Sequence, residues 1–221
     1  MILLLGDIHG DCGILKRALD VSKHSDATAI IQLGDFGLFQ DNEDWFRKNI
    51  EDAHIPIYFI DGNHDDCRRW IECDSVHRVW DDRELYYIPR GTIMELDGRT
   101  IAVMGGASSI NKAWLLRDNM HWDPNEDITE TQINHLLKNA EGKQIDMFLT
   151  HCPPHSVIDK NFDPLWKLHF EVSIDWTDPN QLIIEDLWHK MGTPMVYSGH
   201  MHKRVQGENY RILDINELLT V

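Results

Sequence analysis

Five short apolar runs, most of them followed by glycine and a cluster of polar residues, constrain the fold of this chain more than any other feature. The runs read ILLL, ATAIIQL, IPIYFI, IDMFLT and PMVYSG. Amphipathic stretches with helical periodicity, such as residues 12–24 and 42–53, lie between the first three. This alternation predicts an α/β protein that begins with parallel strands joined by right-handed crossovers.

The remaining elements follow from the same patterns. Residues 91–106 are typical of a β-hairpin that turns at Asp97-Gly98. Thr129 and Gln132 have the spacing of a capping box at the start of a helix over 128–142, and a further helix is expected at 181–192. A final strand is expected near residues 210–215. We find no repeat or linker in the 221 residues and expect one domain over 1–221.

The polar clusters point to a metal site. In an open α/β sheet, ligands bind beyond the carboxyl ends of the strands, so clusters at several strand ends converge on one edge. Carboxylate, imidazole and amide groups together suit first-row divalent metals, and this set is large enough for two ions. The residues concerned are Asp7, His9, Asp35, Asn63, His64, Asp65, His151, His200 and His202.

Composition and charge limit the possible partners and cellular location of the protein. The net charge of −16, from 37 acidic and 21 basic residues, disfavours stable binding to nucleic acid. No stretch approaches the ~20 apolar residues of a membrane span, and the apolar start is too short for a signal peptide. The four cysteines form no CxxC pair. We therefore expect a cytoplasmic protein with reduced thiols and no membrane association.

The motifs GDIHG, GDFG, GNHD, THCPP and SGHMH, in this order, resemble the signature of calcineurin-like metallophosphoesterases. The resemblance spans Gly6 to His202. It implies an α/β fold, a four-layer α/β/β/α sandwich of two mixed β-sheets flanked by helices, which we expect instead of a single doubly wound sheet. It also implies a hydrolase in which a hydroxide bridging two divalent metals attacks a phosphoester. Manganese is the first candidate, and ligand type also admits iron, zinc or nickel.

The resemblance also implies individual roles. The ligands would be Asp7, His9 and His202 for one metal, and Asn63, His151 and His200 for the other. Asp35 would bridge the two ions, and Asn63 would also contact the substrate. His64 would be catalytic without binding metal, protonating the leaving oxygen or steadying the phosphate.

Two motifs depart from the pattern of Ser/Thr protein phosphatases. The second motif lacks the DRG that those enzymes usually carry, and the third reads GNHD instead of GNHE. The usual acidic partner of the general-acid histidine is therefore unassigned. The main expectation is hydrolysis of a phosphomonoester or small phosphodiester. A protein phosphatase, a nuclease and a metal-binding scaffold without turnover are the alternatives, although the presence of His64 favours activity.

A second stretch, beginning GGASSINKAWLLRDNMHWD at Gly105, is similar to a segment of small bacterial and phage phosphoesterases. It suggests that Arg117 contacts the substrate phosphate or a neighbouring carboxylate. The alternative is a structural ion pair with Asp118 or Asp123.

The loop-rich segment from about Pro153 to Asn180 leaves two alternatives open. It carries four large aromatic residues, Phe162, Trp166, Phe170 and Trp176. They could stack a base or aryl group over the metals, or form a separate hydrophobic cluster or a contact between subunits of a homo-oligomer. Candidate substrates are a phosphorylated small molecule, a nucleotide or a phosphoprotein.

Overall fold

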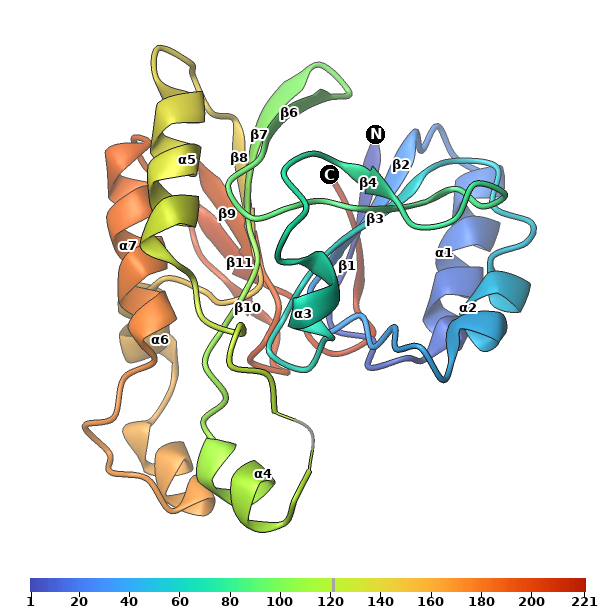
Figure 1. Ribbon diagram of the computed structural model, residues 1–221. Helices are drawn as coiled ribbons and strands as arrows, with labels where there is room; N and C mark the ends of the chain where they lie inside the picture. Colours follow the sequence, from blue (N-terminus) through green and yellow to red (C-terminus); the bar gives the residue numbers. More distant parts are fainter. Residues whose placement is uncertain (121) are drawn as a thin grey trace.

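Two six-stranded sheets pack face to face, and helices cover the outer face of each (Figure 1). The computed structural model describes residues 1–120 and 122–221. The first sheet has the order β12 (Leu218–Thr220), β1 (Ile2–Leu5), β2 (Ala29–Leu33), β3 (Ile57–Ile60), β5 (Leu85–Tyr87) and β4 (His77–Arg78). The second has the order β10 (Val205–Gln206), β11 (Tyr210–Ile212), β9 (Met195–Ser198), β8 (Met147–Thr150), β7 (Arg99–Met104) and β6 (Ile93–Leu96). The predicted four-layer sandwich is confirmed.

The first sheet begins with the predicted strand–helix alternation. Strands β1, β2, β3 and β5 pair in parallel, while β12 and β4 pair antiparallel at the two edges. Helix α1 (Cys12–Lys23) starts after Asp11, whose carboxylate accepts a hydrogen bond from the Gly13 N–H at 2.8 Å. Helix α2 (Glu43–Asn49) is shorter than the predicted 42–53. A single turn, α3 (Cys67–Trp70), follows the third strand-end motif.

The second sheet is reached through the predicted hairpin. Asp97 and Gly98 both have positive φ, 54° and 72°, as the tight turn between β6 and β7 requires. Strands β7, β8, β9 and β11 then pair in parallel. Helix α5 (Glu130–Ala140) has the predicted capping box at Thr129 and Gln132. Helix α7 (Pro179–Lys190) lies close to the expected 181–192.

Three apolar clusters correspond to the three interfaces between the four layers. One packs α1 against the first sheet and includes Leu15 and Phe59. A second packs α5 and α7 against the other sheet and includes Leu136 and Ile184. The third lies between the two sheets and contains Leu4 with ten other buried residues. The sheets are therefore held in one fixed arrangement by a dry layer of aliphatic side chains.

The segment between β7 and α7 contains helices that periodicity did not indicate. Helix α4 (Lys112–Arg117) lies in the stretch from Gly105 that is similar to a segment of small phosphoesterases. The expected loop over 153–180 contains α6 (His155–Asn161) and a 3-10 helix, η1 (Pro164–Phe170). In Figure 1, α4 and the orange turns of η1 project together below the sheets. Within residues 1–120 and 122–221, none of the helices combines the length and apolar character that a membrane span requires.

Candidate metal centre

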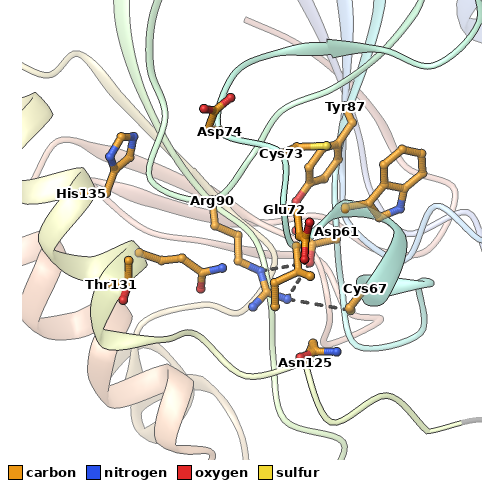
Figure 2. A pocket seen from close by; sticks show the side chains of 13 residues that line it. Asp61, Cys67, Glu72, Cys73, Asp74, Tyr87, Arg90, Asn125, Thr131 and His135 are labelled. Carbon is orange, nitrogen blue, oxygen red and sulfur yellow. Dashed lines mark hydrogen bonds and ion pairs between the residues drawn. The ribbon is translucent and has the colours of Figure 1, made fainter.

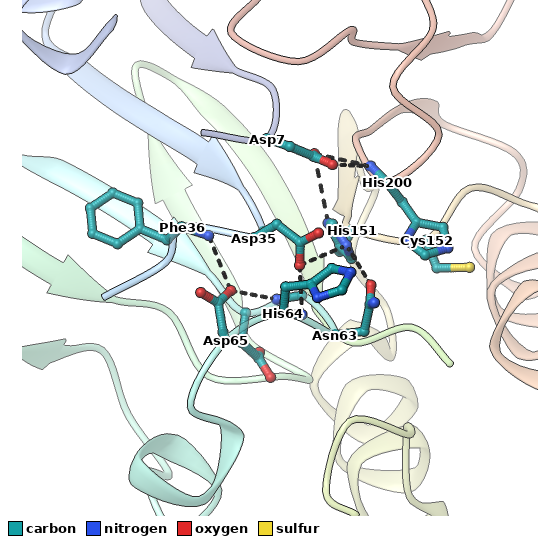
Figure 3. A network of polar contacts seen from close by, with 12 residues as sticks. Asp7, Asp35, Phe36, Asn63, His64, Asp65, His151, Cys152 and His200 are labelled. Carbon is teal, nitrogen blue, oxygen red and sulfur yellow. Dashed lines mark hydrogen bonds and ion pairs between the residues drawn. The ribbon is translucent and has the colours of Figure 1, made fainter. Parts of the chain in front are cut away.

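The motif side chains meet where the carboxyl ends of strands from both sheets come together (Figure 3). Asp7, Asp35 and Asn63 follow β1, β2 and β3 of the first sheet. His151 and His200 follow β8 and β9 of the second. Parallel strands end at the same edge of a sheet, so each sheet delivers its part of the set to a shared rim.

The chain leaves these strands through unusual backbone conformations. Four of the predicted ligands have left-handed φ values: His9 at 44°, Asp35 at 54°, His200 at 70° and His202 at 46°. Non-glycine residues rarely adopt this region, and such strain is concentrated at functional sites. The sharp turns bring these side chains toward one another within a few residues of the strand ends, with Asp35 buried and His9 and His202 more exposed.

Two glycines allow the backbone to approach the side chains closely. A Cβ atom at Gly62 would lie 2.2 Å from Asp35 Oδ1 and 2.6 Å from His151 Nε2. A Cβ atom at Gly199 would lie 2.1 Å from Asp7 Oδ1. No other residue type fits at these positions without displacing the site, which gives the glycines of the GNHD and SGHMH motifs a physical reason.

Asp7, His9, Asp35 and His202 form one group whose candidate ligand atoms all lie within 4.8 Å of one another. His202 Nε2 is 3.0 Å from Asp7 Oδ2 and 3.0 Å from His9 Nε2. His9 Nε2 is 3.8 Å from Asp35 Oδ2. That carboxylate oxygen is buried and has no hydrogen-bond partner among the described residues. A buried carboxylate oxygen requires a partner, and a divalent cation among these four side chains would fit as one.

His151, Asn63 and His200 form a second group on the other side of Asp35. The His151 Nδ1–H donates to the Leu33 carbonyl oxygen at 2.8 Å. This bond orients the ring so that Nε2 faces Asn63 Oδ1 at 3.2 Å and Asp35 Oδ1 at 3.3 Å. Hydrogen bonding of one ring nitrogen to a carbonyl is the usual support for a metal-binding histidine. The two oxygens of Asp35 therefore face different groups of candidate ligands.

The charges in this site are strongly coupled. Burial opposes ionisation of Asp35, but His151, His64 and His9 outweigh it and hold the pKa of Asp35 below its usual range. Burial would lower the pKa of His151, but Asp35 and the hydrogen bond with it raise that pKa to about 10. Burial and the neighbouring His151 lower the pKa of His200 to about 3. His200 is therefore neutral at pH 7, the form that binds a metal.

Asp65, the last residue of the GNHD motif, joins two of the strand-end loops. It is buried, and its carboxylate accepts hydrogen bonds from the N–H groups of Phe36 at 3.2 Å, Gly37 at 2.7 Å and Gly62 at 2.8 Å. These bonds tie the loop after β2 to the loop after β3, and so place Asp35 beside Asn63. The sequence indicated only that Asp65 belongs to a strand-end cluster.

A second polar connection orients the Asn63 amide. Its Nδ2 donates to Ser109 Oγ at 3.2 Å, and Ser109 Oγ donates to Glu126 Oε2 at 2.6 Å. The Ser109 N–H also donates to Glu126 Oε1, at 2.9 Å. This leaves Asn63 Oδ1 facing His151. Ser109 belongs to the stretch from Gly105, whose resemblance to small phosphoesterases suggested a place beside the site, whereas no sequence signal pointed to Glu126.

A buried ion pair between Arg90 and Asp61 lies beside the GNHD motif (Figure 2). Arg90 donates through Nε to Asp61 Oδ2 at 3.0 Å, and through its terminal nitrogens to the carbonyl oxygens of Asp127 and Glu126 at 2.7 and 3.1 Å. Tyr87 donates to the other Asp61 oxygen at 3.0 Å. Both charged side chains are buried, so the pair couples the end of β3 to the loop that carries Glu126.

Cys152, Asp178 and His200 also place candidate ligand atoms within 4.8 Å of one another. The oxygens of Asp178, however, already accept from the N–H groups of Ser108 at 3.0 Å and Asn180 at 2.7 Å, and from the Cys152 thiol at 3.4 Å. Asp178 is the N-cap of α7, so this group is a buried structural contact.

The two remaining predicted residues occupy different surroundings. His64 is half-buried; its backbone N–H donates to Asp35 Oδ1 at 2.9 Å, and its ring lies 5.6 Å from that of His9. Arg117 instead extends to solvent at the end of α4, with a side chain 61% exposed and hydrogen-bonded to Asp118 at 3.0 Å. The structure brings His64 to the metal ligands and does not bring Arg117 to them; contact with substrate remains a prediction for Arg117.

Comparison with known proteins agrees with this arrangement. Residues 1–204 match the family of calcineurin-like phosphoesterases. The chain belongs to this family. An uncharacterized protein of Haemophilus influenzae is 27% identical over 212 residues, which cover 92% of this chain and 84% of that protein.

Solved structures show the same fold at low sequence identity. The crystal structure of TT1561 of Thermus thermophilus matches this phosphoesterase with a TM-score of 0.56 and 15% identity, over 96% of this chain and 87% of the other. A second crystal structure gives a TM-score of 0.58 and 11% identity, over 96% and 89%. Membership in the family supports metal-dependent hydrolysis of phosphorylated substrates.

Proposed function

We propose that this protein hydrolyses phosphomonoesters or small phosphodiesters with two divalent metal ions. The position of Asp35 is the observation that supports two ions best. Its Oδ1 lies 3.3 Å from His151 Nε2, and its unpartnered Oδ2 lies 3.8 Å from His9 Nε2. One carboxylate facing two groups of ligands is the arrangement expected of a bridge between paired ions.

The proposed ligand sets are those implied by the motifs. One ion would be held by Asp7, His9 and His202, and the other by Asn63, His151 and His200. Nitrogen and oxygen ligands of this kind admit manganese, iron, zinc or nickel, and we take manganese as the first metal to test. Such ions, when bound, lower the pKa of water toward ~7 and offset charge on the transferring phosphoryl group.

The chain's own residues would supply the remaining steps. Asn63 and His64 border a cavity next to the ligands, where they can contact a phosphate oxygen. We propose that the imidazole of His64 donates a proton to the leaving oxygen, which must be protonated as its bond to phosphorus breaks. The hydrogen bond from the His64 N–H to Asp35 fixes the position of this residue relative to the proposed bridge.

Hydrolysis of p-nitrophenyl phosphate and bis-p-nitrophenyl phosphate tests the proposal. The protein is stripped of metal and restored with manganese, and Asp35→Asn and His64→Ala are compared with His77→Ala, a control at an exposed position on β4. We expect activity to require metal and to fall in both site variants. Manganese binding should weaken in Asp35→Asn and persist in His64→Ala, which separates ligation from catalysis.

Each contrary outcome has a distinct meaning. Two bound manganese ions per chain without turnover of either ester would favour a scaffold or an enzyme of narrow specificity. With glycerol 2-phosphate, whose leaving alkoxide is a far stronger base than p-nitrophenolate, a His64→Ala variant as active as the His77→Ala control would remove the proposed proton donor. Failure to bind any divalent metal would refute the proposal. The preferred ester distinguishes a monoesterase from a diesterase.

A further inference from the structure

A cavity of about 530 Å³ connects the candidate metal ligands to the aromatic segment 162–176. Its lining includes five residues of the strand-end motifs, Asp35, Asn63, His64, His200 and His202. The same cavity is lined by the four large aromatic residues of the segment, Phe162, Trp166, Phe170 and Trp176. Its volume falls within the ~300–1,000 Å³ of typical small-molecule sites. A ligand with its phosphate at the metals would thus extend toward aromatic rings.

The aromatic residues of the cavity, called the aromatic wall below, include rings that pack against one another. The rings of Trp166 and Phe170 meet edge to face, with centroids 6.0 Å apart, and Phe170 also contacts Trp114 of α4 at 5.6 Å. Phe162 packs against the core cluster beside α7, whereas Trp166, Phe170 and Trp176 lie outside the three core clusters of described residues. All four rings of the segment remain partly accessible. All four residues thus contribute surface to the cavity.

Hydrogen-bonding groups without partners accompany these rings. Gln181 lines the cavity and is only 4% exposed, yet its side-chain amide has no hydrogen bond to any described residue. The indole N–H of Trp166 is buried and likewise unpaired within the described chain. The Asn111 amide, also in the lining, makes no capping bond to α4. Of these groups the Trp166 N–H is buried, and a buried donor is costly unless a partner pairs with it.

We propose that this cavity binds a nucleotide, with the base against the aromatic wall and the phosphoester at the metal ligands. The inference rests on the proposed function. Aromatic faces stack on bases, and the amides of Gln181 and Asn111 match the donor and acceptor edge of a base. A simple phenyl ring would stack equally well but has no edge that could hydrogen-bond to those amides. The polar groups therefore favour a nucleobase over an aryl phosphate.

Charge favours a single nucleotide over a nucleic-acid chain. The net charge of −16 opposes association with a long polyanion. Lys203, by contrast, lines the cavity, with its Nζ 4.8 Å from the centre of the Phe162 ring, where it offers a local positive charge. In the reaction, the P–O bond to ribose breaks, water supplies a hydroxyl to phosphorus, and His64 donates a proton to the leaving oxygen and regains the one that the water releases.

Comparing kcat/KM among phosphoesters tests this assignment. The four 5′-nucleoside monophosphates and 2′,3′-cyclic AMP are compared with glycerol 2-phosphate, which has no ring, and with phosphotyrosine, which has a ring without base edges. The variants are Trp176→Leu and Gln181→Leu, with Trp45→Leu as a control because Trp45 is exposed on α2 and does not line the cavity. Quenching of tryptophan fluorescence by AMP measures binding without turnover.

We expect at least one nucleotide to exceed both glycerol 2-phosphate and phosphotyrosine roughly 10-fold or more in kcat/KM, as one stacked base allows. Trp176→Leu and Gln181→Leu should lose most of this advantage while hydrolysing glycerol 2-phosphate normally. The monophosphate and cyclic substrates distinguish a nucleotidase from a cyclic phosphodiesterase.

Several results would overturn the inference. A preference for phosphotyrosine over every nucleotide would assign the wall to an aryl group. Equal rates for nucleotides and glycerol 2-phosphate, or equal losses for both in the variants, would remove base recognition. Quenching by AMP without turnover of any ester would retain the nucleotide site and refute the proposed function. Neither quenching nor turnover would refute both.

Discussion

Ser109→Ala isolates the contribution of a single hydroxyl group to the metal centre. That hydroxyl donates to the Glu126 carboxylate at 2.6 Å and accepts from the Asn63 amide at 3.2 Å. A hydrogen bond to a charged group contributes ~1.5–3 kcal/mol and a neutral one ~0.5–1.5 kcal/mol. The Ser109 backbone bond to Glu126 persists in the variant. We therefore expect the free energy of unfolding to fall by about 2–4 kcal/mol.

The effect on metal binding should be larger than stability alone implies. Without its partner, the Asn63 amide is free to rotate, and its Oδ1 no longer has to face His151. Loss of a group that orients a metal ligand typically weakens metal affinity or activity roughly 10- to 100-fold. Calorimetric titration with manganese measures the affinity, denaturant unfolding measures the stability, and p-nitrophenyl phosphate measures the rate.

Ser108→Ala provides a matched control one residue away. The Ser108 hydroxyl also bonds to a carboxylate, that of Asp127, and accepts from the Asn180 amide at 2.9 Å, but it does not contact Asn63. We expect a similar loss of stability with manganese affinity unchanged. If the two variants lose affinity equally, or if Ser109→Ala binds manganese as tightly as the unmodified protein, the positioning role is wrong.

Three further predictions follow from individual contacts. Gly199→Ala places a methyl group 2.1 Å from Asp7 Oδ1, and should cost about 1–3 kcal/mol in denaturant unfolding and abolish binding of one manganese equivalent in a calorimetric titration. Burial would lower the pKa of His151, but nearby carboxylates raise that pKa to about 10. The protonated ring therefore stabilises the metal-free protein fully below pH 6.5, and this stabilisation is lost as pH rises through 10. Unfolding of the metal-free protein at pH 6–10 should show this decline, and calorimetry at pH 8 in buffers of different ionisation enthalpy should show proton release on manganese binding; no proton release would contradict it. Burial raises the pKa of the Cys152 thiol, so iodoacetamide at pH 8 should modify the more accessible Cys73 first, as judged by mass spectrometry.

The parts of the fold that sequence could predict are those with local signals. The strands before Asp7, Asp35 and His151 are largely apolar runs, and the turn at Asp97-Gly98 has one favoured geometry. Helix α5 carries its own capping box. Such signals depend on neighbouring residues alone, so they can be found without knowledge of tertiary structure.

Features that depend on distant contacts could not be predicted in this way. Strands β4 and β12, of two and three residues, are too short for periodicity and form because an edge of the first sheet is available to them. The contact between Asn63 and Ser109 joins residues 46 apart. The aromatic segment lacks a clear helical period, and Pro164 within it and Pro179 just after it each begin a helix. Its closeness to the metal ligands arises from the fold as a whole.

The aliphatic layer between the two sheets has a consequence for how the centre can change. Asp7 and Asp35 are fixed to one sheet and His151 and His200 to the other, so the distances between these side chains depend on the thickness and register of that layer. A displacement of about 1 Å can cost an enzyme ~100-fold in rate. Replacing Leu4 by a residue of different volume should therefore change the rate of hydrolysis without altering any ligand. The aliphatic side chains between the sheets therefore hold the candidate ligands at their distances, which gives them a part in the geometry of the site as well as in the stability of the fold.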